Sequence, residues 1–91
     1  MDRKQILDSL KAEMIETLQK VLRFETVTTD ALPGMPFGKN NADCLAYVLK
    51  KGEEMGFKSY NCDNYAGHLD FAADDKNAEV FGVLAHLDVV P

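Results

Sequence analysis

Hydrophobic and polar residues follow two different periods along this chain, and the change of period separates helical from extended segments. In residues 2–24, apolar side chains recur at three- and four-residue spacings, which predicts an amphipathic helix with Asp2 as its N-cap. The apolar stripe of this helix consists of Ile6, Leu7, Leu10, Met14, Leu18, Val21 and Leu22. We expect the stripe to pack against a sheet.

The next segments predict a loop and a second helix. Residues 25–37 contain a run of β-branched residues and then two prolines and a glycine, which favours a loop. Residues 39–55 regain helical spacing, and Asn40 or Asn41 could cap the helix. Gly52 on its inner face would let a neighbouring element approach closely, and Gly56 suits the position that ends the helix.

The last third of the chain predicts three strands. Residues 57–62 and 67–73 read as short strands joined by a turn at Asp63 and Asn64, and residues 74–77 form a polar turn. Residues 79–89 are apolar on both alternating faces, which is typical of a strand buried on both sides. The order helix, helix, strand, strand, strand predicts an α/β fold with two helices on a mixed sheet.

Composition excludes several classes of function. The chain has 91 residues, enough for one domain, and 46% of them are hydrophobic, which argues against disorder. Its net charge of -5 and lack of a basic patch argue against nucleic acid as a partner. We expect no membrane partner, because no segment is long and apolar enough to span a bilayer. The start of the chain lacks a secretion signal, so we expect a cytoplasmic protein in which Cys44 and Cys62 are reduced thiols.

One His and one Asp interrupt the apolar run of residues 79–91. His86 and Asp88 are two residues apart, so on a strand their side chains point the same way, at the carboxyl end where α/β sheets place ligand sites. Imidazole is the commonest metal ligand in proteins, and a neighbouring carboxylate can orient it. By itself the His-x-Asp spacing is a weak signal, and a structural histidine is the plain alternative.

The other polar groups favour structural roles. His68 shares a polar strand face with Asp70, which predicts an exposed or turn-supporting role. Asp70, Asp74 and Asp75 lack the spacing of a calcium loop and are expected to form a solvated edge and turn.

The wider string around His86, residues 82–91 (GVLAHLDVVP), resembles the first metal-site motif of the co-catalytic zinc metallopeptidases. Residues 21–27 (VLRFETV) are similar to the end of the first helix in that superfamily. Three shorter strings, PFG at 36–38, GEEMGFK at 52–58 and NYAGH at 64–68, look like the PepV-type dipeptidase branch. The resemblance covers nearly the whole chain, and the terminal motif is its most specific part.

This resemblance implies a fold, a reaction and roles for two residues. Residues 1–91 would be the N-terminal portion of a three-layer α/β/α zinc-peptidase domain. His86 would ligate one ion of a two-zinc site, with manganese or cobalt as alternatives, and Asp88 would act in catalysis by holding the imidazole. Metal-activated water would then hydrolyse dipeptides.

The sequence departs from the family pattern by ending at Pro91. The remaining metal ligands, the general-base Glu and the lid domain would lie further along a full-length chain. We therefore expect the 91-residue chain to be inactive alone, because a catalytic zinc needs three protein ligands. The alternative is a non-catalytic α/β module that binds a partner or self-associates through an exposed sheet edge.

Overall fold

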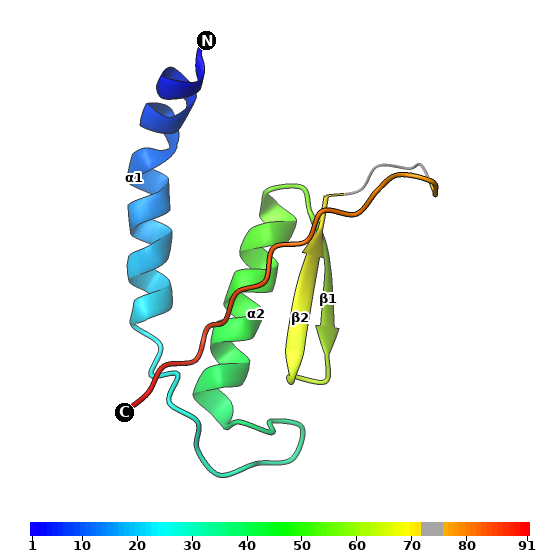
Figure 1. The fold of residues 1–91 in the computed structure, drawn as a ribbon. Helices are drawn as coiled ribbons and strands as arrows, with labels where there is room; N and C mark the ends of the chain where they lie inside the picture. The colour runs from blue at the N-terminus through cyan, green and yellow to red at the C-terminus, as the bar shows by residue number, and fades with distance from the viewer. Residues whose placement is uncertain (72–75) are drawn as a thin grey trace.

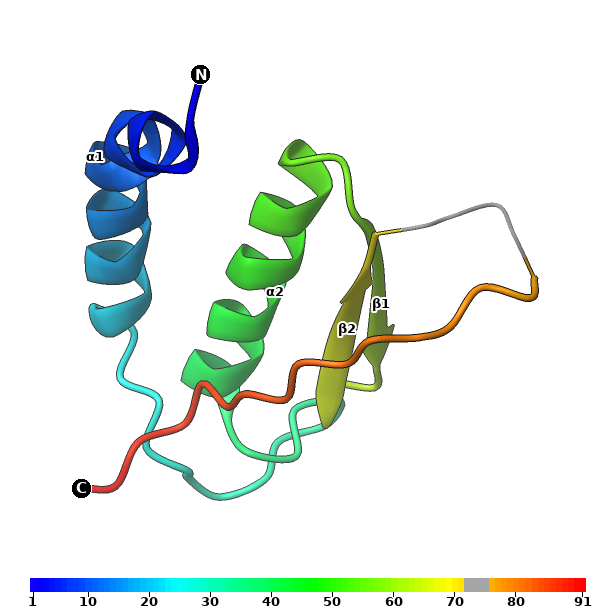
Figure 2. The same ribbon diagram turned by 45° about the horizontal axis from the view of Figure 1, so that its top comes forward.

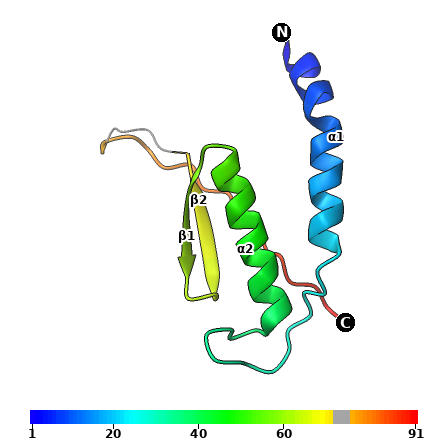
Figure 3. The same cartoon turned by 180° about the vertical axis from the view of Figure 1, so that it is seen from behind.

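The computed structural model describes residues 1–71 and 76–91, which form two helices followed by a hairpin (Figure 1). The elements in chain order are α1 (Arg3–Leu22), α2 (Lys39–Glu54), β1 (Lys58–Cys62) and β2 (Ala66–Asp70). α2 lies between α1 and the hairpin in all three views (Figures 1, 2 and 3). The α/β class is as predicted, but the sheet formed by the described residues is a two-stranded antiparallel one, not a mixed one.

α1 begins where the sequence predicted. The Asp2 carboxylate accepts a hydrogen bond from the Gln5 backbone N–H at 2.8 Å, and the Gln5 side chain accepts one from the Asp2 N–H at 2.9 Å. This reciprocal capping box satisfies two donors that the first turn would otherwise leave unpaired. The helix ends at Leu22, shortly before the β-branched residues that follow.

The predicted packing of α1 on a sheet is wrong. No residue of α1 is buried, because α2 separates this helix from the hairpin. An ion pair connects the two helices: Lys51 Nζ donates to Glu13 Oε1 at 2.7 Å. The apolar residues that α1 leaves exposed are Ile6, Leu7, Leu10, Met14, Ile15, Leu18 and Leu22.

α2 has a different N-cap from the one predicted. Gly38, with φ of 96°, occupies the cap position without a side-chain hydrogen bond, and neither Asn40 nor Asn41 caps the helix. Asn41 instead donates from Nδ2 to the carbonyls of Phe37 and Val27, which fixes the loop between the helices. The other end agrees with the prediction, since Gly56 follows the helix with φ of 96°.

The core is small and lies between α2 and the hairpin. The buried residues of α2 are Ala42, Cys44, Leu49 and Gly52. A Cβ added to Gly52 would lie 2.4 Å from Cδ2 of Leu69 on β2, so the predicted close approach at this glycine is confirmed. Gly67 of β2 is packed against Leu49 in a similar way.

The hairpin has the turn predicted for Asp63 and Asn64. Both residues have positive φ, 51° and 61°, and the Tyr65 N–H donates to the Cys62 carbonyl, which closes the turn between the strands. The strand register pairs Tyr60 with His68. Residues 72 and 73 of the predicted second strand, and Asp74 and Asp75 of the predicted polar turn, lie outside the described residues.

The predicted third strand is absent from the described residues. Residues 79–91 form no strand and run past α2 to the chain end near the α1–α2 loop (Figures 1 and 2). Their apolar side chains are largely exposed, so the predicted burial on both faces is wrong. The composition favours an extended backbone, but a strand also needs a neighbouring backbone to pair with.

None of the helices in the described residues is long and apolar enough to cross a bilayer.

Candidate metal centre

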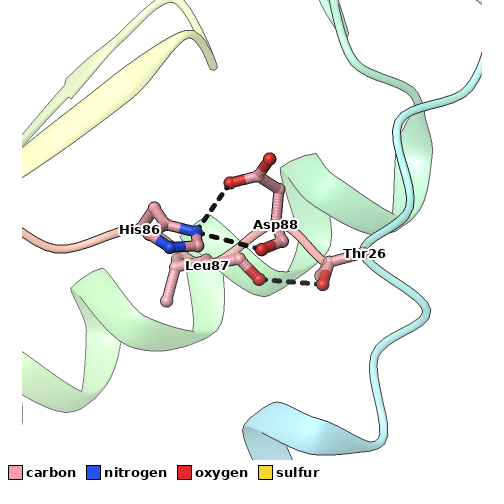
Figure 4. Close-up of polar contacts among 4 residues, drawn as sticks. All are labelled: Thr26, His86, Leu87 and Asp88. Carbon is pink, nitrogen blue, oxygen red and sulfur yellow. Dashed lines mark hydrogen bonds and ion pairs between the residues drawn. The ribbon is translucent and has the colours of Figure 1, made fainter. Parts of the chain in front are cut away.

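His86 and Asp88 lie side by side on the extended terminal segment (Figure 4). His86 Nδ1 is 3.1 Å from Asp88 Oδ1 and 3.1 Å from the Asp88 backbone carbonyl oxygen. A backbone carbonyl and an ionised carboxylate can only accept hydrogen bonds, so Nδ1 is the donor to both. In the neutral imidazole Nε2 then keeps its lone pair, which is the electronic state that a metal ligand requires.

The environment of this pair differs from the expected one. The side chain of His86 is 83% exposed and that of Asp88 is 60% exposed. The sequence placed them at the end of a buried strand, whereas the described segment is solvated on the side where they lie. Solvent screening makes the attraction between the two groups small, so the arrangement is set mainly by the backbone.

Thr26 in the α1–α2 loop holds the segment that carries the pair. Its Oγ1 donates to the Leu87 carbonyl at 2.8 Å, and its own carbonyl accepts from the Val89 N–H at 3.2 Å. Thr26 is almost fully buried. Figure 4 shows this contact directly beside the His86–Asp88 pair.

Sequence reasoning missed the contribution of Thr26. The sequence places Thr26 in the β-branched run that favours a loop and in the string of residues 21–27, and neither feature assigns it a contact. A threonine hydroxyl within a loop is a common donor to distant backbone, but the sequence gives no signal for an acceptor 61 positions away.

The described residues fit one part of a metal centre and not the whole of it. Among residues 1–71 and 76–91, no group of three or more His, Cys, Asp or Glu side chains is placed to hold a metal ion. A catalytic zinc takes three protein ligands and leaves one position for water or substrate. His86 could supply at most one ligand of such a site, and the described residues do not complete a set of three beside it.

A second His-Leu-Asp tripeptide occurs on β2. His68 Nδ1 lies 3.0 Å from Asp70 Oδ1, and the His68 ring stacks on Tyr60 of β1 with 5.2 Å between the ring centres. Both side chains are more than half exposed, in agreement with the predicted exposed role. The same tripeptide thus forms the same pair in two places, which shows that the pair geometry alone does not identify a metal site.

The two cysteines are free, as expected for reduced thiols. Cys44 is completely buried in α2, and burial raises the pKa of its thiol above the ordinary value of 9.0. Cys62 at the end of β1 is exposed.

Two shallow hollows lie away from the His86–Asp88 pair. One, of about 260 Å³, is lined by Lys20, Arg23, Phe24 and Tyr47. The other, of about 290 Å³, is lined by Gly34, Asn61, Asp63 and Asn64 at the hairpin turn.

The chain is similar to bacterial proteins named as dipeptidases. It is 40% identical over 83 residues to "Putative dipeptidase YtjP" of Bacillus subtilis, a match that covers 89% of this chain and 17% of that protein. It is 33% identical over 81 residues to "Putative dipeptidase" of Staphylococcus epidermidis, covering 87% of the chain and 17% of the relative. It is 29% identical over 90 residues to "Beta-Ala-Xaa dipeptidase" of Lactobacillus delbrueckii, covering 97% of the chain and 18% of that protein.

The chain therefore spans less than a fifth of the length of these relatives. No protein-family model matches it. The similarity supports a relationship to dipeptidases over most of this chain and leaves the larger part of each relative without a counterpart in the 91 residues.

Proposed function

We propose that this chain is a segment of a metal-dependent dipeptidase of the PepV type, to which it contributes His86 as a metal ligand and Asp88 as the residue that orients it. The proposal is carried by the string of residues 82–91, which resembles a metal-site motif and sets His86 apart from His68. The hydrogen bond of His86 Nδ1 to Asp88 leaves Nε2 available for a metal. The similarity to proteins named as dipeptidases supports the reaction class. Zinc is the proposed metal, and manganese or cobalt would also accept a site of imidazole and carboxylates.

Each residue has a defined task in this proposal. His86 binds through Nε2, Asp88 fixes the tautomer and the ring orientation, and Thr26 holds the backbone on either side of Asp88. When bound, a two-metal centre supplies an activated water and polarises the scissile carbonyl. The substrate would be a dipeptide, in line with the name of the Lactobacillus relative.

The remaining ligands and the general base are proposed to belong to the part of a dipeptidase that this chain does not match. The three-layer α/β/α domain and the lid are proposed on the same ground. Because the described residues offer too few ligands for a metal centre, we propose that the 91-residue chain has no peptidase activity alone.

A chimera tests this function in a complete enzyme. The segment of the Bacillus subtilis relative that aligns with this chain is replaced by the chain itself, and hydrolysis of dipeptides is measured with zinc or manganese. We expect the chimera to be active. His86→Ala should lower its activity by at least about a hundredfold, because loss of a residue that merely supports a metal ligand already lowers activity by up to about that factor.

The matched control is His68→Ala, which removes the histidine of the other His-Leu-Asp pair. The proposal predicts that this variant keeps its activity. Equal losses from both substitutions would mean that the effect is structural, and an active His86→Ala chimera would exclude His86 as a ligand.

Calorimetric titration with zinc measures whether the 91-residue chain binds the metal that the proposed activity would require. We expect absent or millimolar binding that His86→Ala does not change. Tight binding lost with His86→Ala would show that the chain, alone or as an oligomer, completes a site.

A further inference from the structure

The loop between α1 and α2, drawn in Figure 1, is closed at its neck by the side chain of Asn41. Asn41 Nδ2 donates to the carbonyl oxygen of Val27 at 3.3 Å and to that of Phe37 at 3.0 Å. The Phe37 carbonyl oxygen also accepts from the Thr29 N–H at 3.2 Å. We call Val27 and Phe37 the loop neck, because these contacts bring the two ends of the loop together.

The loop neck is tightly packed, and the tip of the loop is held separately. A Cβ added to Gly38 would overlap Oγ1 of Thr29, so the two sides of the loop touch at this point. At the tip, Asn64 Nδ2 donates to the Gly34 carbonyl oxygen at 2.8 Å, which fixes the tip to the hairpin turn. The loop is therefore an ordered unit whose neck and tip have different anchors.

The loop neck adjoins the residue that holds the terminal segment, because Val27 directly follows Thr26. The Thr26 hydroxyl donates to the Leu87 carbonyl, and the Thr26 carbonyl accepts from the Val89 N–H. The carbonyls of Thr26 and Val27 belong to successive planar peptide groups, which only the two backbone torsions of Val27 separate. When Asn41 fixes the Val27 carbonyl, it therefore restricts the rotation of the carbonyl that binds Val89.

The closure of the loop neck depends on the amide group of Asn41. Both acceptors are backbone carbonyls, so the group between them must donate, and the NH2 of an asparagine carries two donors. An ionised aspartate has the same shape but only accepts hydrogen bonds, so it would present a negative charge to both carbonyls. Asn40 precedes Asn41 and is exposed, so the same substitution can be made there without touching the loop neck.

We propose that Asn41 is a positioning residue for His86. Its side chain fixes the loop neck, and the loop neck fixes the carbonyl of Thr26. Thr26 then holds the backbone on both sides of Asp88, whose carboxylate orients the His86 ring. This inference rests on the proposed function, because it takes His86 to be a metal ligand. Asn41 acts through the backbone and not by contact with the metal.

Hydrogen exchange of the Val89 amide in the 91-residue chain tests this role without any metal. Asn41→Asp should speed the exchange by about two- to tenfold, the range that corresponds to the loss of one hydrogen bond. Asn40→Asp is the matched control, because it adds the same charge to the first turn of α2, where a carboxylate is favoured. Its Val89 amide should exchange at the wild-type rate. Equal rates in the two variants would overturn the proposal.

The zinc dependence of the dipeptidase chimera tests the consequence for the metal. Asn41→Asp should raise the zinc concentration for half-maximal activity severalfold, by less than the roughly 10- to 100-fold effect of removing a group bonded to a metal ligand. The KM for the dipeptide at saturating zinc should not change, and Asn40→Asp should leave both values at those of the unmodified chimera. A variant that merely folds less well would lower the maximal rate and leave the half-maximal zinc concentration unchanged.

The two measurements separate failure of this inference from failure of the proposed function. Faster Val89 exchange in Asn41→Asp with an unchanged zinc requirement would show that Asn41 holds the segment without positioning a ligand, which contradicts the inference alone. Full activity of the His86→Ala chimera would reject the proposed function, and the role of Asn41 towards the metal would fail with it. The exchange measurement would then report only on the closure of the loop neck.

Discussion

Thr26 Oγ1 donates a hydrogen bond to the carbonyl of Leu87 at 2.8 Å, which joins the α1–α2 loop to the segment that carries His86 and Asp88. The Thr26 carbonyl accepts from Val89 at the same time, so one residue contacts the backbone on both sides of Asp88. The position of the candidate metal ligand thus depends on a loop residue that has no metal chemistry of its own.

Replacing Thr26 with Val should loosen the terminal segment. The substitution keeps the shape of the side chain and removes a hydrogen bond with a net contribution of about 1 kcal/mol. We expect the Val89 amide to exchange its hydrogen about fivefold faster, which corresponds to that free energy. Hydrogen exchange followed by NMR measures the effect. Thr28→Val, at an exposed position of the same loop, is the control. Equal exchange rates of the Val89 amide in the two variants would show that the Thr26 hydroxyl does not stabilise the terminal segment.

The Glu13–Lys51 ion pair should make the α1–α2 contact dependent on pH. The hydrogen bond from Lys51 lowers the pKa of Glu13 below its ordinary value of 4.5, and the bond to Glu13 raises the pKa of Lys51 above 10.5. The Glu13 contribution to stability is therefore present above pH 4.5 and lost as the pH falls through the lowered value. The Lys51 contribution is present below pH 10.5 and lost as the pH rises through the raised value.

Urea unfolding of the wild type and Glu13→Gln measures this dependence. The wild type should be the more stable at neutral pH, and the difference should shrink towards acid and in high salt, because the pair is exposed and screened. Glu16→Gln, which breaks a pair within α1 alone, is the control. A stability difference that is unchanged at low pH would exclude the ion pair as its cause.

The two thiols should react at very different rates. Cys44 is buried and its pKa is raised by burial, so little thiolate is present and reagents cannot reach it. Cys62 is exposed. Titration with an aromatic disulfide reagent should give one fast thiol per chain, which Cys62→Ser removes, and a second that reacts only on unfolding. Two fast thiols in the native chain would contradict the described burial of Cys44.

Gly52→Ala should destabilise the chain although alanine favours helix. The added Cβ would lie 2.4 to 2.9 Å from Cδ2, Cδ1 and Cγ of Leu69. Overpacking of this kind typically costs about 1 to 3 kcal/mol, which outweighs the gain in helix propensity of up to about 1 kcal/mol. A double-mutant cycle with Leu69→Ala checks the contact by urea unfolding, because the smaller side chain should remove the penalty. Strictly additive effects would show that the two residues do not meet.

Local sequence signals predicted the elements that form from neighbouring residues. The Asp2 cap, the turn at Asp63 and Asn64 and the close approach at Gly52 each depend on short-range chemistry, and the structure has all three. The predicted N-cap of α2, Asn40 or Asn41, is wrong. Asn41 donates to carbonyls of the preceding loop, and Gly38 occupies the cap position.

The other errors concern elements that need distant partners. Residues 79–89 have the composition of a buried strand, but no neighbouring strand among the described residues pairs with them or covers Phe81 and Leu84. The apolar stripe of α1 is likewise without a sheet to cover it. For the candidate site, the spacing of His86 and Asp88 predicted the paired side chains, whereas the tether from Thr26 depends on a contact that no local pattern encodes.

The arrangement of contacts along the chain has a consequence for the order of folding. α2, β1 and β2 are consecutive and pack on one another, so this unit assembles by closing short loops. The Thr26–Leu87 bond closes a loop of 61 positions, which carries a larger entropic penalty and few accompanying contacts. The terminal segment should therefore dock after the helix and hairpin have formed and should open before they do. His86 and Asp88 are thus positioned after the helix and hairpin have formed and are released before these elements unfold.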